Sequence, residues 1–180
     1  MKTLLRGRQL LLITVGLLAF NSSNASAHDH DSALNYMTLN GLRAVALQVE
    51  GIRRDFTRFG LNADTILATT TKVLSDNGID VVDLDFAKSH PDAALMRIKL
   101  NANENQYRFY MYGISIELKQ KLSLNNPAGG FISATIWRQG KTGVIMPTDL
   151  RQINDRIAEL LAEFIDDYRS QNPKRVSIVQ

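Results

Sequence analysis

The 180-residue sequence contains no cysteine, and this absence excludes several kinds of chemistry at once. Disulfide bonds, thiolate metal sites, cysteine nucleophiles and thioether-linked haem all need a sulfhydryl group. The lipid-modified cysteine of bacterial lipoproteins is excluded for the same reason. A chain of this length buries enough apolar surface to fold without such cross-links.

Long apolar runs are also absent, since none approaches the roughly 20 residues that a helix needs to cross a bilayer. An eleven-residue apolar run, Leu10–Phe20, follows a basic stretch at residues 2–8 and precedes the small residues A-S-A at 25–27. This order is typical of a secretory signal peptide over residues 1–27. We therefore expect cleavage near Ala27, a periplasmic or secreted protein, and no transmembrane segment in the mature chain.

The excess of positive charge belongs to the predicted signal peptide. The whole sequence has a formal net charge of +3, and residues 1–27 hold three basic residues and no acidic one. The rest of the chain is therefore balanced. Its charge gives no reason to expect binding to nucleic acid.

Apolar periodicity predicts five strands and two helices after residue 40. The expected strands are 42–49, 81–86, 95–100, 107–124 and 131–137, and the expected helices are 62–77 and 149–170. Gly113 is expected to form a bulge within its strand, and residues 140–143 are expected to form a turn.

The element order, β-α-β-β-β-β-α, predicts an α+β fold. The strands after Pro91 are joined by short turns and should pair as an antiparallel meander. Each helix has a single apolar stripe, so both should pack on the same face of the sheet. We expect a two-layer sandwich with a largely antiparallel sheet of four to five strands. Residues 28–40 are expected to be a flexible arm, 41–173 a single domain, and 174–180 a tail.

The run into Ala134-Thr135-Ile136-Trp137, and a helix ending in F-I-D-D-Y at 164–168 before Asn172-Pro173, resemble a group of short exported proteobacterial proteins of unknown function. The resemblance covers most of residues 42–173. The order of elements is also similar to that of periplasmic accessory proteins that serve transport or envelope assembly. The resemblance implies an accessory role in the cell envelope, although many such proteins are lipid-anchored through a cysteine that this chain lacks.

A candidate metal site lies directly after the predicted cleavage bond. If the mature chain begins at His28, His30 is its third residue. A free α-amine, two backbone amides and the His30 imidazole can then enclose Cu(II) or Ni(II) in a square plane, with His28 as a further ligand. The alternative is a solvated linker. No other cofactor is expected.

Two groups of residues are candidates for binding a partner. Arg53, Arg54 and Arg58 alternate with phenylalanines in a loop, and arginine with aromatic residues is typical of interfaces. Tyr110 and Trp137 are the candidates from an aromatic set of which one face can pack in the core and the other is expected to line an open sheet face. The alternatives are a solvated loop and ordinary sheet packing.

We therefore expect a non-enzymatic binding or accessory protein of the envelope, whose partner is an envelope protein, a lipid or a glycan. Copper or nickel handling is the second hypothesis. An enzyme is the third, because candidates for acid, base and nucleophile are few. His90 is the only histidine outside the arm, and it stands near scattered aspartates rather than in a ligand motif.

Overall fold

The protein folds around a five-stranded mixed sheet with the strand order β2-β1-β3-β4-β5. This computed structural model describes residues 39–124 and 129–173. The strands are β1 (Ala44–Glu50), β2 (Asp80–Val82), β3 (Ala93–Glu104), β4 (Tyr110–Ser123) and β5 (Phe131–Ile145). The α-helices are α2 (Ala63–Asp76), α3 (Leu84–Ser89) and α4 (Gln152–Gln171), and the short 3₁₀ helices are η2 (Arg54–Phe59) and η3 (Pro147–Asp149).

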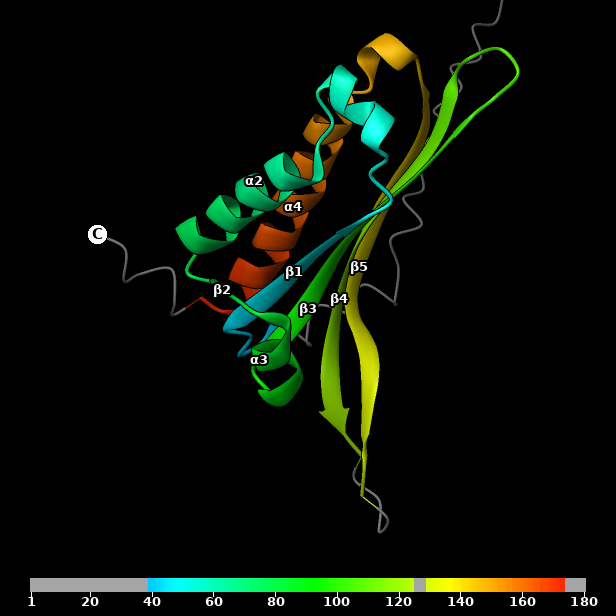
Figure 1. Ribbon diagram of the computed structural model, residues 1–180. Coiled ribbons are helices and arrows are strands. Elements are labelled where there is room, and N and C mark those ends of the chain that lie inside the picture. The colour runs from blue at the N-terminus through cyan, green and yellow to red at the C-terminus, as the bar shows by residue number, and fades with distance from the viewer. Residues whose placement is uncertain (1–38, 125–128, 174–180) are drawn as a thin grey trace, which may run out of the picture.

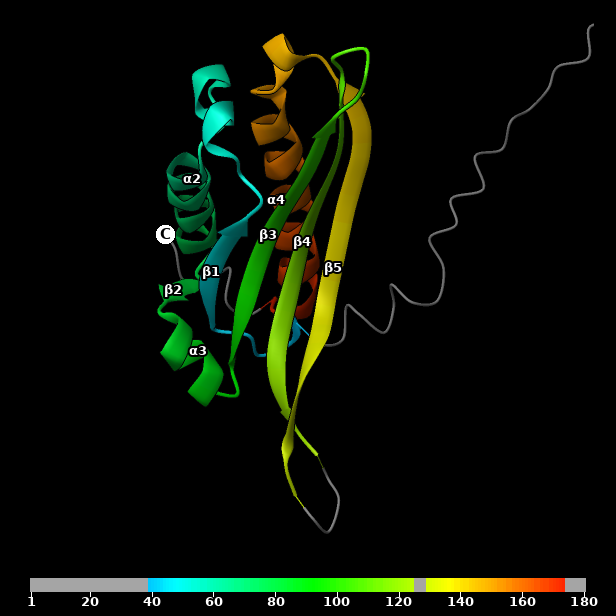
Figure 2. The ribbon, with the colours of Figure 1, turned by 45° about the vertical axis from the view of Figure 1, so that its right-hand side comes forward.

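Helices α2 and α4 lie together on one face of the sheet, as Figures 1 and 2 show. The short helix α3 packs against the opposite face, near the start of β1. Ala87 of α3 clusters there with Ala44 and Ala46, whereas Val45 between them belongs to the main core. Successive side chains of a strand point to opposite faces, so this separation places α3 opposite the helix pair.

The main core lies between α4 and the central strands. Met96 and Ile98 of β3 and Ile116 and Leu118 of β4 are buried on this face. The apolar stripe of α4 covers them, with seven buried residues: Ile153, Ile157, Leu160, Leu161, Phe164, Ile165 and Tyr168. The predicted α+β class and the two helices on one face are confirmed.

The start and end of α2 agree with the sequence prediction to within one residue. Asn62 is the N-cap, and its side chain accepts a hydrogen bond of 2.8 Å from the Asp64 backbone N–H. Gly78 follows the helix with φ of 72°, a conformation that glycine adopts without strain. Ile79, which follows it, is fully buried.

The sheet is less antiparallel than predicted. The meander of β3, β4 and β5 is confirmed, but β1 pairs in parallel with both β2 and β3. The connection from β1 to β2 and the connection from β1 to β3 both contain a helix. Such a connection brings the chain back to the end of the sheet where β1 begins, as parallel pairing requires.

Helix α3 is a correction to the prediction of a strand or loop at 81–86. The strand stops at Val82, and the Asp83 side chain then caps a helix by accepting a 2.7 Å hydrogen bond from the Phe86 backbone N–H. With six residues, α3 is too short to show a helical stripe in the sequence. Its start is marked only by the capping aspartate.

The β-bulge lies in β5, not at Gly113 as predicted. Gly113 pairs regularly with Asn101 and Thr142, whereas the register of β4 with β5 shifts between Leu118 and Lys119. Ile136 is the extra residue, because Thr135 pairs with Lys119 and Trp137 with Leu118. The shift turns Trp137 from the open face to the core, where it is 2% exposed. Its predicted place on the open face is therefore wrong.

Residues 140–143 form part of β5 instead of the predicted turn. A Cβ at Gly140 would lie 2.8 Å from the Ile114 carbonyl oxygen, so the two strands approach closely here. Lys141 reaches toward α4 and pairs with Glu159 at 2.7 Å and with Glu163 at 3.3 Å. Gly140 therefore permits close packing of β4 and β5, and the ion pairs of Lys141 link the edge strand β5 to helix α4.

Replacing the two sheet glycines by alanine tests this arrangement. Gly140→Ala should lower the free energy of unfolding by about 1–3 kcal/mol, because the new methyl group collides with backbone. Gly113→Ala is the matched control, since its Cβ would meet only the Thr142 methyl group at 3.7 Å. Chemical denaturation measures both. If both substitutions changed the free energy of unfolding equally, residue 140 would not lie close to β4, which would contradict a continuous β5.

Trp137 also ties β5 to α4 through a polar contact. Its indole N–H donates a 2.8 Å hydrogen bond to the Asp167 carboxylate. Partial burial raises the pKa of Asp167, the indole hydrogen bond opposes that rise, and the charges of Asp166 and Glu163 add to it. Because the folded state holds this proton more tightly than the unfolded state, ionisation of Asp167 lowers stability as the pH rises above its ordinary pKa.

We expect Asp167→Asn to stabilise the protein at pH 7, because the amide oxygen still accepts from the indole and carries no charge. The gain should shrink as the pH falls toward 3.8, the ordinary pKa of the carboxyl, where the wild-type group is protonated. Denaturation curves at several pH values measure this. A stabilisation that is the same at every pH would contradict the assigned cause, and Asp167→Ala reports the loss of the acceptor alone.

Candidate functional site

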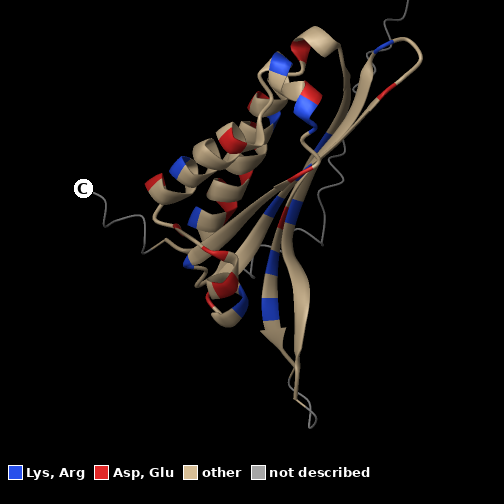
Figure 3. Ribbon diagram, viewed as in Figure 1, with Lys and Arg blue, Asp and Glu red and all other residues tan. Residues whose placement is uncertain are grey.

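The face of the sheet turned away from α2 and α4 carries a row of charged side chains. We call it the open face. Its charged residues are Glu50 on β1, Arg97 and Lys99 on β3, Glu117, Lys119 and Lys121 on β4, and Arg138 on β5. Strand alternation and the register of neighbouring strands place them together, because residues two apart along a strand point to the same face. Figure 3 shows the basic residues along the strands.

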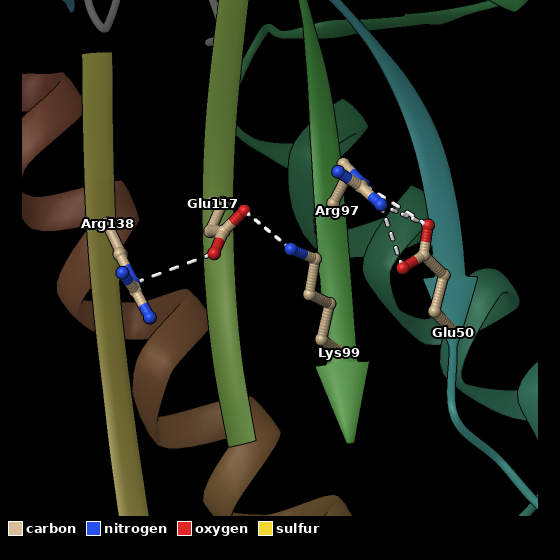
Figure 4. Close-up of polar contacts among 5 residues, drawn as sticks. All are labelled: Glu50, Arg97, Lys99, Glu117 and Arg138. Carbon is tan, nitrogen blue, oxygen red and sulfur yellow. Dashed lines mark hydrogen bonds and ion pairs between the residues drawn. The ribbon is translucent and has the colours of Figure 1, made fainter. Parts of the chain in front are cut away.

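Ion pairs link neighbouring strands across this face (Figure 4). The Arg97 guanidinium contacts both oxygens of Glu50, with Nη2 at 2.6 and 2.9 Å. Lys99 donates to Glu117 at 2.9 Å, and Arg138 Nε lies 3.6 Å from the other oxygen of the same carboxylate. Cross-strand pairs of opposite charge stabilise a sheet, so these contacts hold β1, β3, β4 and β5 in register.

Glu117 is the best-buried charged group of the open face, with 7% of its surface exposed. The hydrogen bond from Lys99 lowers the pKa of Glu117, burial opposes the shift, and the positive charges of Lys99, Arg138 and Lys119 add to it. The carboxylate therefore stays ionised at neutral pH. It balances neighbouring cations rather than serving as a proton donor.

The open face has a surplus of positive charge. Its five basic residues face two carboxylates, and both carboxylates are engaged in the pairs just described. Within the described part of the chain, Lys119 and Lys121 form no ion pair. The Lys121 ammonium instead lies 4.1 Å from the centre of the Phe131 ring, in a cation–π contact.

A groove opens where α3 meets β4 and β5, with a volume of about 440 Å³. We call it the lysine groove. Its lining residues are Leu84, Ala87, Lys88, Leu95, Lys119, Gln120, Lys121, Phe131, Ile132 and Ser133. Half of this lining is apolar, and three lysines from two separate elements border it. The lysine groove therefore combines an apolar surface with positive charge.

An exposed apolar patch lies at the other end of the sheet. Met111 of β4 pairs with Val144 of β5, and the two are 56% and 65% exposed. Tyr107 in the preceding turn is 71% exposed, and Phe109 and Met146 are also exposed. The open face thus has apolar surface at both ends and charges between them, which is the composition of an interaction surface.

The predicted partner-binding residues do not come together. Tyr110 is 3% exposed, its ring packs edge-on against Phe56 at 5.5 Å, and it lies in the core with Trp137. Neither side chain is presented on the open face.

The arginine loop forms η2, on the helix side of the sheet. Its aromatic residues pack inward, since Phe56 is fully buried and Phe59 contacts the core. Arg53 pairs with Asp55 at 2.8 Å, and Arg58 lies 4.6 Å from the centre of the Phe59 ring. Arg54 is exposed. The loop and the open face are therefore separate surfaces.

The predicted metal ligands His28 and His30 lie outside the described residues, so the copper or nickel site stays a prediction. His90 is exposed, stacks on Phe86 with 3.6 Å between ring centres, and has its Nδ1 3.0 Å from the Phe86 carbonyl oxygen. In residues 39–124 and 129–173, no group of three histidine or acidic residues could hold a metal ion. No helix of that part is long and apolar enough to cross a membrane.

None of the candidate sites inferred from the sequence included Glu117, Lys119 or Lys121. Their spacing of two residues along a strand was the available signal. Lys88 had no comparable signal, because its position depends on α3. The lysine groove also forms only because α3 packs on the sheet, and no local sequence pattern predicts that packing.

Comparison with known proteins adds little to this description. No family model matches the chain, and no curated protein matches it. It is similar to the structure of a minor lipoprotein from Acinetobacter baumannii, with 10% identity, a TM-score of 0.35, and coverage of 73% of this chain and 95% of that one. It is also similar to rare lipoprotein B from Shewanella oneidensis, with 13% identity, a TM-score of 0.23, and coverage of 68% and 96%. Similarity at this level carries no argument about function.

The role of Glu117 in the open face is testable. Glu117→Gln should lower the free energy of unfolding by about 1.5–3 kcal/mol at pH 7, because a buried hydrogen bond between charged groups is weakened. The pKa of Glu117 is lowered in the folded state, so its contribution is present above the ordinary pKa of 4.5 and is lost as the pH falls below it. The difference between variant and wild type should therefore disappear in acid.

Asp80→Asn is the control for this experiment, because Asp80 is an exposed acidic residue on β2. Urea denaturation at pH 7 and at acid pH measures both variants. A loss in Glu117→Gln that persists unchanged in acid would show that packing, rather than charge, accounts for the effect.

Proposed function

We propose that the chain is an exported, non-enzymatic binding protein of the cell envelope that holds an anionic partner against the open face of its sheet. The observation that carries this proposal is the surplus of positive charge beside the lysine groove. Export rests on the predicted signal peptide, and the accessory role is the one that the sequence resemblance implies.

Charge favours an anionic partner on physical grounds. Lys119 and Lys121 have no ion pair with a described residue, and Lys88 has only an exposed contact with Asp85 at 3.1 Å. Exposed pairs of that kind contribute little, so the lysines are available to a ligand at small cost. A positive surface also accelerates the approach of an anion and rejects cations.

Binding fits the chemistry of the open face better than catalysis. Its charged groups are mostly lysine and arginine, and a positive surface attracts anions. The best-buried acid, Glu117, is held ionised by Lys99 and Arg138. These groups attract and orient a charged molecule, whereas acid–base catalysis needs a group that exchanges its proton near neutral pH.

Site-specific photo-crosslinking in the native host tests the proposal. A photoreactive amino acid replaces Met111 or Phe131 on the open face, and in a matched control it replaces Lys72, which is exposed on α2. We expect adducts from the open-face positions and none from position 72. Lys119→Glu should reduce the adducts because it reverses a charge beside the groove.

Mass spectrometry of the adducts identifies their chemical class. Equal labelling at all three positions would contradict the proposal, and so would an absence of adducts from positions 111 and 131 in a folded, exported protein. Adducts that are insensitive to Lys119→Glu would show that charge plays no part in recognition.

A further inference from the structure

The lysine groove contains an apolar surface that α3 leaves uncovered. Ala87 packs on the small residues Ala44, Ala46 and Ala93, so the helix sits close to the sheet. Leu84, one turn earlier, is 41% exposed and borders the groove together with Leu95 and Ile132. The volume of about 440 Å³ lies in the range of small-molecule sites. An apolar chain placed here would cover surface that water now contacts.

A second hollow of about 190 Å³ adjoins the first. It is lined by Ser89, His90 and Pro91, and it shares Lys88, Lys121 and Phe131 with the lysine groove. The two shared lysines therefore stand where the lysine groove meets the second hollow. The Phe131 ring lies beneath the Lys121 ammonium and is itself 64% exposed.

We propose that the lysine groove binds a single-chain anionic amphiphile of the fatty-acid type, with its carboxylate at Lys88 and Lys121 and its hydrocarbon chain along Leu84, Leu95 and Ile132. This inference rests on the proposed function and names its ligand class. The hydrocarbon chain fills the lysine groove, and the charged group lies where the groove meets the second hollow.

The lining favours such a ligand over a peptide or a free anion. A peptide brings a backbone N–H and C=O at every residue, and each needs a hydrogen-bond partner when it is buried. Apart from the lysines, the polar side chains of the lysine groove are those of Gln120 and Ser133. A free anion would leave the apolar surface exposed. An amphiphile with one charged end covers the apolar surface and places its charge at the two shared lysines.

Isothermal titration calorimetry with sodium laurate, below its micelle-forming concentration, tests the inference on the processed protein. We expect one site per chain. The double substitution Lys88→Glu and Lys121→Glu should weaken binding about tenfold or more, because it reverses both charges at the head group. Lys72→Glu with Arg54→Glu is the matched control, since it makes the same charge change at exposed positions outside the groove and should bind laurate like the wild type.

Ser133→Trp tests the apolar part of the lysine groove separately. Ser133 is exposed on β5 and lines the groove, so an indole there fills the space without entering the core. Laurate binding should be lost while the thermal unfolding midpoint is kept. The neutral detergent dodecyl maltoside, with the same chain length, should bind more weakly than laurate, and acetate should not bind.

Several outcomes would overturn the inference. Laurate binding that is unchanged in the double charge variant, or acetate binding as tight as laurate binding, would do so. Dimerisation of the wild type that Ser133→Trp abolishes, without laurate binding, would assign the groove to a second copy of the chain. If laurate does not bind but crosslinks from position 111 persist, this inference fails and the proposed function stands. If those crosslinks are also absent, both fail.

Discussion

The alternation of side chains along β4 is the constraint on which both faces of the molecule depend. Ile114, Ile116 and Leu118 are buried beneath the helices, and Glu117 and Lys119 between and beside them take the opposite face. A slip of one residue would exchange the two sets, burying the charges and exposing the core. The apolar core therefore selects the register, and the register determines where positive charge collects. The binding surface is a consequence of how the core packs.

Elements whose signals are local were predictable from the sequence. Helices α2 and α4 have long apolar stripes, and β3 to β5 are joined by short turns, so their order and pairing followed. The predicted start of the last helix at residue 149 was wrong, because residues 147–149 form η3 and α4 begins at Gln152 without a side-chain cap. The parallel pairing of β1 with β3 joins residues about 50 positions apart in the chain and has no local signal. Helix α3 has too few residues for periodicity to reveal it.

The candidate site was harder to predict because it depends on those missed features. An open sheet face with exposed aromatic residues was expected, and Tyr107 and Phe131 are indeed exposed. Trp137 was misplaced because one extra residue at Ile136 inverts the alternation that follows it. Lys88 reaches the lysine groove only because α3 packs on that face. Local sequence patterns identified the face, and tertiary packing determined which residues lie on it.

The bulge at Ile136 also affects the edge that β5 forms in the described sheet. β5 is the outermost strand, and residues 131–137 contain no charged side chain. A long, regular and uncharged edge is a template for pairing with other chains, and hence for aggregation. The bulge interrupts that regularity, and the charged residues Arg138 and Lys141 lie beyond it on the same strand. The same bulge that directs Trp137 into the core thus also makes the edge strand β5 a poorer template for pairing with a second copy of the protein.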